Sequence, residues 1–223
     1  METPHSAKRR DGGSRNLTEE AYDHVRMAIL RGQLTVGAVV AEGEVASALG
    51  MSKTPVRQAL QMLRREGLLE IGRRRQLIVR GFTADRREEI LEVREALERI
   101  AVRHACTSMA IDDVDYLHLL LMRQRRAIEA GSDDDFVDLD EEFHLWIAEG
   151  AGLPIVARLL GQLRGFVRIM RLGAERVRDA SPAVDEHAAI VAAIEARDAD
   201  AAEAALLAHL EASNASHVPA AAQ

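Results

Sequence analysis

Apolar side chains recur every three or four residues in three stretches near the start of the chain, which is the spacing of one helix face. The first stretch predicts a helix that Thr18 caps and that ends before Gly32. The second predicts a short helix at 42–49, with Gly50 as its stop. The third begins directly after Ser52, so the pattern predicts two short helices joined by a tight turn.

The third helix has two chemically different faces. Its apolar stripe comprises Val56, Ala59, Leu60 and Leu63. Its other face carries Lys53, Thr54, Arg57, Gln58, Gln61 and Arg64. Two short helices with a polar and basic outer face on the second are typical of a helix-turn-helix. In that arrangement Ser52 and Thr54 suit phosphate contacts, while Lys53 and Arg57 can reach guanine in the major groove.

After Gly67 the apolar spacing changes to that of β-strands. Residues 68–71 and 77–80 predict a hairpin, and its tip holds three consecutive arginines, Arg73, Arg74 and Arg75. A run of charge by itself is equally typical of a solvated surface. Following a helix-turn-helix, the hairpin is instead expected to form a wing that lies beside the phosphate backbone.

The remainder of the chain shows helical spacing without a strand pattern. Six helices are expected at Asp85–Cys106, Ile111–Ala130, Asp133–Gly150, Pro154–Val177, Pro182–Arg197 and Ala199–Ser216. Six helices of this length form an antiparallel bundle. The fold class is therefore mostly α, with an N-terminal winged helix-turn-helix and a C-terminal antiparallel all-helical bundle.

Charge is distributed unevenly along the 223 residues, whose net charge is −7. Residues 1–82 carry 14 Lys and Arg against 9 Asp and Glu, whereas residues 83–223 are acidic. The basic part can bind phosphate even though the whole chain is acidic. The single cysteine, Cys106, excludes a disulfide framework and is expected to pack in the core. The longest apolar run, Ala188–Ile194, is too short to cross a membrane, so we expect a cytoplasmic protein.

Four side chains in the helical region are candidates for a metal site. Asp140 and His144 are four residues apart and share one helix face. His187 and His209 lie at equal distances before and after a turn expected near residue 198, so an antiparallel helix pair places them level. Imidazole and carboxylate ligands could then bind one ion. Solvent-facing histidines on separate helices are the alternative that the spacing leaves open.

The amino-terminal motifs resemble the GntR family of bacterial repressors. The resemblance is carried by Ile29–Leu34, Leu49–Leu60 and Leu63–Leu69. It implies a homodimer that binds double-stranded DNA at a palindromic operator through two winged helix-turn-helix domains. Lys53 occupies a position where the family usually has arginine, and the hairpin tip lacks the usual glycine, so the resemblance does not imply a particular operator sequence.

Most of residues 86–212 resemble the FCD effector domain of FadR-type GntR proteins, in its six-helix, VanR-like subgroup. The matching segments are Val93–Glu98, Asp140–His144, Glu186–Ile190 and Ala208–Leu210. Many such domains bind a divalent metal through one aspartate and three histidines, which correspond here to Asp140, His144, His187 and His209. This ligand set suits Zn²⁺, Ni²⁺ or Mn²⁺.

Arg94 matches the arginine with which family members hold a carboxylate, so the resemblance implies a small organic-acid effector. The alternative for Arg94 is a surface ion pair with Glu98, four residues later. Further candidates for an anion are Arg164, Arg168 and Arg171. Phe143 and Trp146 are expected in the core.

These observations give four segments: a flexible basic arm at 1–16, a DNA-binding domain at 17–81, an effector domain at 82–216 and a flexible tail at 217–223. The leading hypothesis is a transcriptional repressor that responds to a small carboxylate bound near the metal. A regulator whose metal is purely structural, or is itself the signal, is the alternative.

A mononuclear metalloenzyme is a more remote hypothesis. A di-metal bundle needs Glu-x-x-His on two helices, and here Glu141 and His144 form one such pair while His187 and His209 have no glutamate three residues before them. Nucleophile-elbow and nucleotide-binding motifs are missing from the sequence. We therefore expect no catalytic activity.

Overall fold

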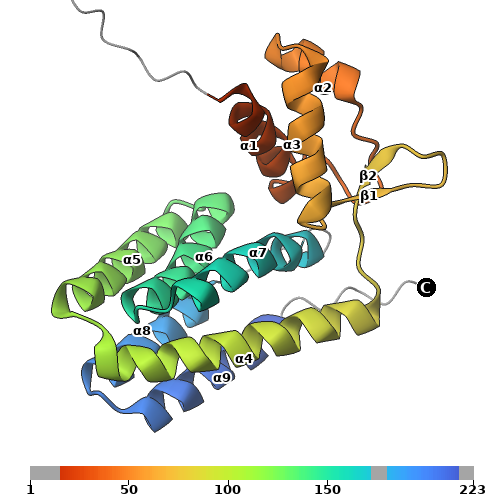
Figure 1. Cartoon of the computed structure of the whole chain (residues 1–223). Coiled ribbons are helices and arrows are strands. Elements are labelled where there is room, and N and C mark those ends of the chain that lie inside the picture. The colour runs from red at the N-terminus through yellow and green to blue at the C-terminus, as the bar shows by residue number, and fades with distance from the viewer. Residues whose placement is uncertain (1–15, 172–179, 216–223) are drawn as a thin grey trace, which may run out of the picture. The chain divides into compact units, whose positions relative to one another are not determined.

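The computed structural model of the chain describes residues 16–171 and 180–215, which divide into two compact units (Figure 1). The first unit comprises the residues up to Ile29 together with Gly37–Arg80. The second comprises Leu30–Val36 together with the residues from Gly81 onward. Of the expected arm and tail, all but Asn16 lie outside the described residues.

Three helices dominate the first unit: α1 (Leu17–Leu30), α2 (Glu42–Leu49) and α3 (Lys53–Arg65). The helix α2 ends because Gly50 adopts a left-handed backbone with a φ of 63°, a conformation that glycine tolerates best. The four apolar residues of the α3 stripe are fully buried. The two short helices expected from the sequence, with a tight turn between them, are confirmed.

The start of α1 differs from the expectation. Thr18 was predicted to cap the helix, but the helix begins at Leu17, and Asn16 Oδ1 accepts the Thr18 backbone N–H at 3.1 Å. The Thr18 hydroxyl donates instead to Gln58 Oε1 on α3, at 3.0 Å. The predicted Thr18 cap is therefore wrong, because Asn16, two residues earlier, accepts the capping hydrogen bond and asparagine is a stronger capping residue than threonine. Ser52 does occupy the N-cap position of α3, although its side chain makes no capping hydrogen bond within the described chain.

A hairpin follows α3. Strands β1 (Leu69–Ile71) and β2 (Leu77–Val79) pair antiparallel, with Leu69 opposite Val79. A further pairing was not predicted: Val39 forms a bridge with Ile78, and the Val40 N–H donates to the Leu77 carbonyl at 2.9 Å. The segment between α1 and α2 therefore covers one edge of the hairpin and anchors it to the helices.

The second unit consists of six described helices: α4 (Ala84–Ser108), α5 (Ile111–Glu129), α6 (Asp133–Gly150), α7 (Pro154–Arg171), α8 (Ser181–Glu195) and α9 (Ala199–Ala215). The expected extension of α7 to Val177 lies outside the described residues, as does the Arg171 side chain. Gly131 and Gly152, which follow α5 and α6, both have positive φ angles, a conformation that suits the turns after these helices. No helix in the described ranges is long and apolar enough to cross a membrane.

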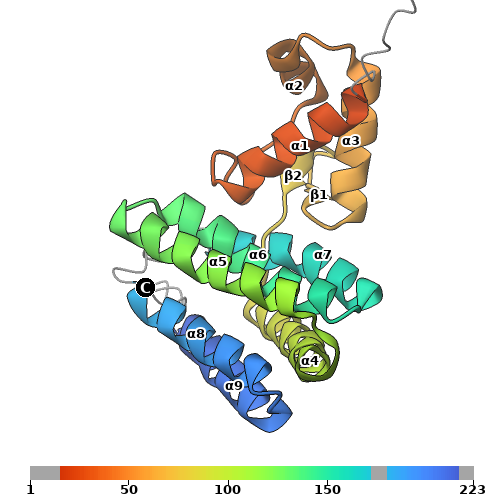
Figure 2. The same ribbon diagram turned by 90° about the vertical axis from the view of Figure 1, so that its left-hand side faces the viewer.

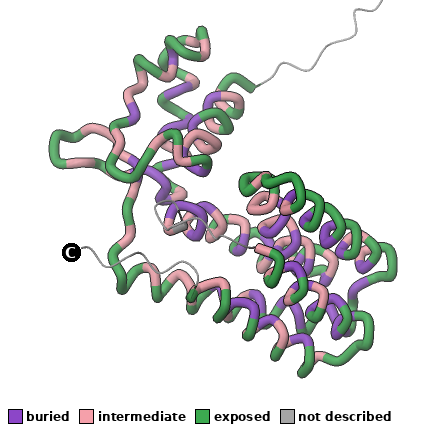
Figure 3. The backbone as a smooth tube through the Cα atoms, turned by 180° about the vertical axis from the view of Figure 1, so that it is seen from behind, coloured by how far each residue is buried: buried purple, intermediate pink, exposed green. Residues whose placement is uncertain are grey.

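The helices pack as a bundle around α4. The α8–α9 hairpin contacts α4 and α5, while α6 and α7 contact α4 from another side (Figure 2). Buried residues follow the facing sides of these helices (Figure 3). The antiparallel bundle expected for this region is confirmed.

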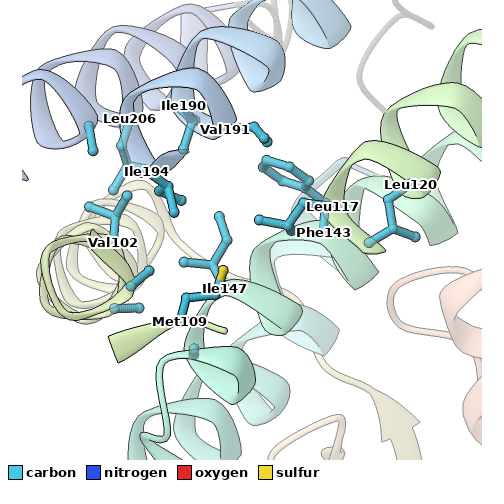
Figure 4. Close-up of a cluster of buried hydrophobic side chains, with 14 of the residues drawn as sticks. Val102, Met109, Leu117, Leu120, Phe143, Ile147, Ile190, Val191, Ile194 and Leu206 are labelled. Carbon is cyan, nitrogen blue, oxygen red and sulfur yellow. The ribbon is translucent and has the colours of Figure 1, made fainter. Parts of the chain in front are cut away.

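A continuous apolar cluster holds these helices together (Figure 4). Phe143, Leu117, Ile190 and Leu206 come from four different helices and are at most 1% exposed. Each such side chain contributes about 1.5–3 kcal/mol through burial. Cys106 is buried in the same cluster, as expected for a packing residue.

The turn between α8 and α9 is fixed to the end of α4 by Arg197. Its guanidinium donates to the backbone carbonyls of Ala105, Cys106 and Met109 at 3.0–3.3 Å. These carbonyls lie at or just after the end of α4. The Ala105 carbonyl also accepts the Met109 N–H at 3.1 Å, so Arg197 adds a second donor to it. The contact fixes α8 and α9 against α4 and so helps to position His187 and His209 opposite each other.

Candidate functional site

Three helices of the second unit direct one acidic and three imidazole side chains to a common point. Asp140 and His144 lie one turn apart on α6, His187 lies on α8 and His209 on α9. All four side chains are buried, with 0–6% of each residue exposed. One ligand atom from each of the four lies within 4.8 Å of all the others. The structure thus brings together the four residues singled out in the sequence.

The imidazole Nε2 atoms form the centre of this cluster. His209 Nε2 lies 3.2 Å from the Nε2 atoms of both His187 and His144. Asp140 Oδ1 lies 3.4 Å from His187 Nε2 and 3.8 Å from His144 Nε2. Ligands around a first-row metal ion, with bonds of about 2.1 Å, are separated by about 3.0–3.4 Å. The measured separations are close to these values.

The opposite ring nitrogens decide where the protons lie. His187 Nδ1 is 2.9 Å from Gln124 Oε1, and His209 Nδ1 is 2.8 Å from Glu186 Oε2. Gln124 Nε2 donates to the Leu139 carbonyl, which leaves its oxygen facing His187 as an acceptor. Carboxylate and amide oxygens can only accept here, so each of these rings carries its proton on Nδ1.

His144 also has a carboxylate near its Nδ1 atom, but the hydrogen-bond geometry is less favourable. Its Nδ1 lies 2.7 Å from Glu98 Oε2, yet neither atom has a well-aligned hydrogen-bond partner in the described chain. An acceptor on the Nδ1 side of each histidine leaves the lone pair of each Nε2 pointing into the cluster. Outer partners of this kind are typical of metal-binding histidines.

The electrostatics also favour neutral imidazoles. Burial lowers the pKa of His187 well below its ordinary value, and the neighbouring His209 lowers it further. Burial, followed by the adjacent His144, lowers the pKa of His209. Neutral imidazoles are the form that binds metal, so the cluster could hold one divalent ion.

A buried ion pair lies next to the cluster. Arg94 Nε donates to Glu98 Oε1 at 2.6 Å, and both side chains are more than nine-tenths buried. Burial opposes ionisation of Glu98, but the charges and hydrogen bonds of Arg94 and His144 together outweigh it and lower the pKa of Glu98 to about 2. The pairing that was considered as a surface contact is thus present but buried. Arg94 Nη1 has no hydrogen-bond partner among the described residues.

A small cavity of about 20 Å³ adjoins both features. Its polar lining comprises Arg94, Glu98, Asp140, Glu141, His144 and Arg164, and aliphatic side chains of α6 and α7 complete it. Arg164 donates to Glu141 Oε2 through both Nε and Nη2. Arg168, another candidate, is engaged by Asp138. The cavity therefore places two arginines beside the possible metal ligands Asp140 and His144.

Phe143 and Trp146 of α6 belong to the core rather than to the cavity lining. Phe143 stacks on the ring of His187 with centroids 4.3 Å apart. Trp146 is partly buried and donates its indole N–H to the Asp113 carbonyl. Phe143 therefore packs directly against a histidine of the cluster, whereas Trp146 packs against Tyr116.

The first unit carries the residues expected to contact DNA. Ser52, Lys53, Thr54 and Arg57 are exposed at the start of α3. The Arg57 guanidinium is held by Glu42 of α2 through hydrogen bonds of 3.0–3.1 Å. The start of α3 is thus a polar surface with two cationic side chains on adjacent turns.

The hairpin tip holds the other expected contacts. The Gly72 N–H donates to the Gln76 carbonyl at 2.8 Å and closes the loop. Arg73, Arg74 and Arg75 are exposed within it, and Arg75 has a φ of 59°. A closed loop with three exposed guanidinium groups can follow a phosphate backbone.

Three residues of these sites were missed by sequence reasoning. Glu42 had no distinguishing pattern, and Glu186 was noted only within a family motif. Gln124 did carry a signal, because it is a polar residue on an otherwise apolar helix stripe and is fully buried. A buried polar side chain needs a partner, and its partners here are His187 and a backbone carbonyl.

Comparison with known protein families matches both units. Residues 17–79 match the model described as bacterial regulatory proteins, gntR family. Residues 89–212 match the model of the FCD domain.

Individual relatives cover nearly the whole chain. The chain is 32% identical over 217 residues to the "Probable D-xylose utilization operon transcriptional repressor" of Paenarthrobacter nicotinovorans, and the alignment covers 91% of each chain. It is 27% identical over 196 residues to the HTH-type transcriptional repressor RspR of Escherichia coli (strain K12), covering 87% of this chain and 86% of RspR. The solved structure of E. coli McbR/YncC has a TM-score of 0.81 at 24% identity, over 89% of this chain and 95% of that one, which shows a shared fold.

Proposed function

Because the chain belongs to the GntR family and is a DNA-binding transcriptional regulator rather than an enzyme, we propose that it is a repressor whose operator affinity is set by a small organic acid bound beside a divalent metal ion. One observation carries this proposal. Three imidazole Nε2 atoms and a carboxylate converge next to a cavity that is lined by Arg94, whose buried Nη1 has no hydrogen-bond partner among the described residues.

The proposed metal ligands are Asp140, His144, His187 and His209. Three nitrogen donors and one oxygen donor suit Zn²⁺, Ni²⁺ or Mn²⁺. When bound, the ion would supply positive charge and an open coordination position for an anionic group. Gln124 and Glu186 would orient two of the imidazoles through their Nδ1 atoms.

The proposed effector is a small carboxylate held by Arg94. A guanidinium binds a carboxylate through two parallel hydrogen bonds, and Arg94 Nη1 is available for one of them. The cavity of about 20 Å³ admits one small group, so a larger acid would extend toward the more exposed Arg164. The name of one relative refers to D-xylose utilization, which makes a sugar acid a reasonable member of a test panel.

The proposed DNA-binding residues are Ser52, Lys53, Thr54, Arg57, Arg73, Arg74 and Arg75. In a helix-turn-helix the start of the second helix contacts base edges, and α3 has its exposed cationic residues there. Ser52 and Thr54 would contact phosphates, and the hairpin arginines would lie along the minor groove or its flanking phosphates. We assign these roles to a DNA-binding domain at 17–81.

The proposed active form is a homodimer on a palindromic operator. Two recognition helices must lie about 34 Å apart to contact successive major grooves, and a symmetric dimer supplies two. The effector domain, assigned to 82–216, would favour one arrangement of the two DNA-binding domains when acid is bound. Repression is proposed because two relatives are named repressors.

Metal analysis and thermal unfolding together test this proposal. Purified protein is analysed for bound Zn, Ni and Mn, and its melting temperature is measured with a panel of small carboxylates, including a sugar acid, before and after chelation. D-xylose serves as the uncharged comparison. A carboxylate-dependent rise in melting temperature that disappears with the chelator supports binding through the metal.

Other outcomes favour the two alternatives. If chelation lowers the melting temperature and no carboxylate changes it, the metal is structural. If the metal itself changes operator affinity without any acid, the metal is the signal. A protein that binds no divalent ion contradicts both the proposal and these alternatives.

A further inference from the structure

A carboxylate of α2 holds the guanidinium that α3 exposes. Arg57 Nε lies 3.0 and 3.1 Å from the two carboxylate oxygens of Glu42, and Arg57 Nη2 lies 3.0 Å from Oε2. The Arg57 side chain is 60% exposed and that of Glu42 is 31% exposed. The pair therefore lies at the surface, and it connects the two helices of the helix-turn-helix.

The contact uses one edge of the guanidinium and leaves the other open. An arginine side chain carries five N–H donors, one on Nε and two on each terminal nitrogen. Glu42 faces the edge formed by Nε and Nη2, so both N–H groups of Nη1 and one of Nη2 remain. Those groups form a second fork, and a fork of this kind matches the O6 and N7 acceptors of guanine.

We infer that Glu42 is a positioning residue for base recognition: it fixes the Arg57 guanidinium so that the Nη1–Nη2 edge is presented to guanine in the major groove. This inference rests on the proposed role of Arg57 in contacting DNA. A long side chain that is already held in one orientation loses less conformational freedom on binding, so the orientation favours the matching base.

The exposure of the pair argues against a mainly structural role. Ion pairs between exposed side chains contribute little to folding stability, because water screens the charges. The hydrogen bonds to Glu42 and its charge do raise the pKa of Arg57, which keeps the guanidinium charged at all relevant pH values. The main consequence of the contact is therefore the direction of the side chain.

The negative charge of Glu42 adds a second consequence. A carboxylate close to DNA repels phosphates whatever the base sequence. Glu42 therefore lowers the affinity for arbitrary DNA while it supports contact with the correct base. Replacement of Glu42 should therefore raise the affinity for arbitrary DNA and weaken the contact with the correct base.

Binding profiles of matched variants test the inference. Wild-type protein first selects its site from a pool of random duplexes, and every base pair of that site is then replaced in turn. Affinities are measured by fluorescence anisotropy for the wild type, Glu42→Gln, Arg57→Ala, the double variant and Glu44→Gln. Glu44→Gln is the control, since Glu44 lies in the same first turn of α2 and its replacement removes the same charge while leaving the Glu42–Arg57 pair intact.

The two variants Arg57→Ala and Glu42→Gln are expected to lose base preference at the same base pair of the site. Arg57→Ala should abolish the preference for one guanine, and Glu42→Gln should reduce the same preference about tenfold. Glu42→Gln should bind unrelated duplexes at least as tightly as wild type, and it should have no further effect on base preference in the Arg57→Ala background. Glu44→Gln should keep the wild-type preference.

The remaining outcomes overturn the inference in distinguishable ways. If Glu42→Gln keeps the guanine preference, or sharpens it, Glu42 does not position Arg57 for recognition. If Arg57→Ala keeps every preference of the wild type, the proposed role of Arg57 is wrong, and the role of Glu42 is wrong with it. Failure of the wild type to select any site contradicts operator recognition itself.

Discussion

His187 Nε2 and His209 Nε2 lie 3.2 Å apart in the interior of the helical unit, and the partners of both rings place the protons on the other nitrogen, Nδ1. Two lone pairs facing each other at this distance repel. A cation between them removes the repulsion, and Asp140 Oδ1, at 3.4 Å from His187 Nε2, adds a negative charge to the same point. A divalent ion bound at this point, as proposed, would therefore stabilise the arrangement.

The residue behind His187 should control metal affinity. Gln124→Leu removes the acceptor of the His187 Nδ1 proton, so the ring loses its fixed orientation. We expect metal affinity to fall about 10–100-fold, as is common for outer partners of metal ligands. Competition with a fluorescent chelator measures it. Met122→Leu, on the exposed side of the same helix, is the control and should keep wild-type affinity; equal affinities in all three proteins would contradict the assigned role of Gln124.

Acidification should destabilise the metal-free protein. The pKa of His187 is lowered by burial from its ordinary value of 6.5, so the unfolded chain binds protons that the folded chain does not. The free energy of unfolding therefore decreases as the pH falls below about 6.5. Melting temperatures of chelated protein across this range measure the effect, with the exposed His104→Gln variant as control. A pH-independent melting temperature would show that His187 is not held neutral.

The hairpin arginines should act on affinity without affecting specificity. Arg74→Ala should weaken binding to the operator and to unrelated duplex by the same factor. It should also reduce the number of counterions released on binding by about one, because a phosphate contact is lost. Titrations at several salt concentrations measure both quantities. Arg158→Ala removes an exposed arginine of α7 and should change neither one. A selective loss of operator binding in Arg74→Ala would indicate a base contact instead.

The stability of the helical unit should depend on the α9 contact with the core. Leu206 is 1% exposed, so Leu206→Ala should lower the free energy of unfolding by about 2–5 kcal/mol. Leu119, which is 40% exposed, should tolerate the same change within about 0.5 kcal/mol. Denaturant unfolding at fixed metal concentration compares the two variants. Equal losses would place Leu206 outside the cooperative core.

Local patterns predicted most of the helices, because their ends carry their own signals. The α6 boundaries, Asp133 and Gly150, coincide with the expected ones. The equal distances of His187 and His209 from the turn near residue 198 also sufficed to predict that the two residues lie opposite each other in an antiparallel helix pair. Contacts between distant segments were different. The bridge between Val39 and Ile78 depends on where the segment between α1 and α2 lies against the hairpin, which no local pattern encodes.

The surroundings of the site were less predictable than its centre. Gln124 faces His187 only because α5 packs against α8 with one particular rotation. The burial of Arg94 and Glu98 depends in the same way on α6 and α7 covering α4. Spacing along one helix predicts which residues share a face of that helix. It does not predict which other helix covers that face, because this depends on the packing of the whole bundle.

Operator affinity measured in four conditions tests the central claim most directly: with and without the divalent metal, each with and without the carboxylate that raises the melting temperature. The account predicts that the acid changes operator affinity in the metal-bound protein and that chelation, or Arg94→Ala, abolishes the change. An equal response to the acid in the chelated protein would contradict it.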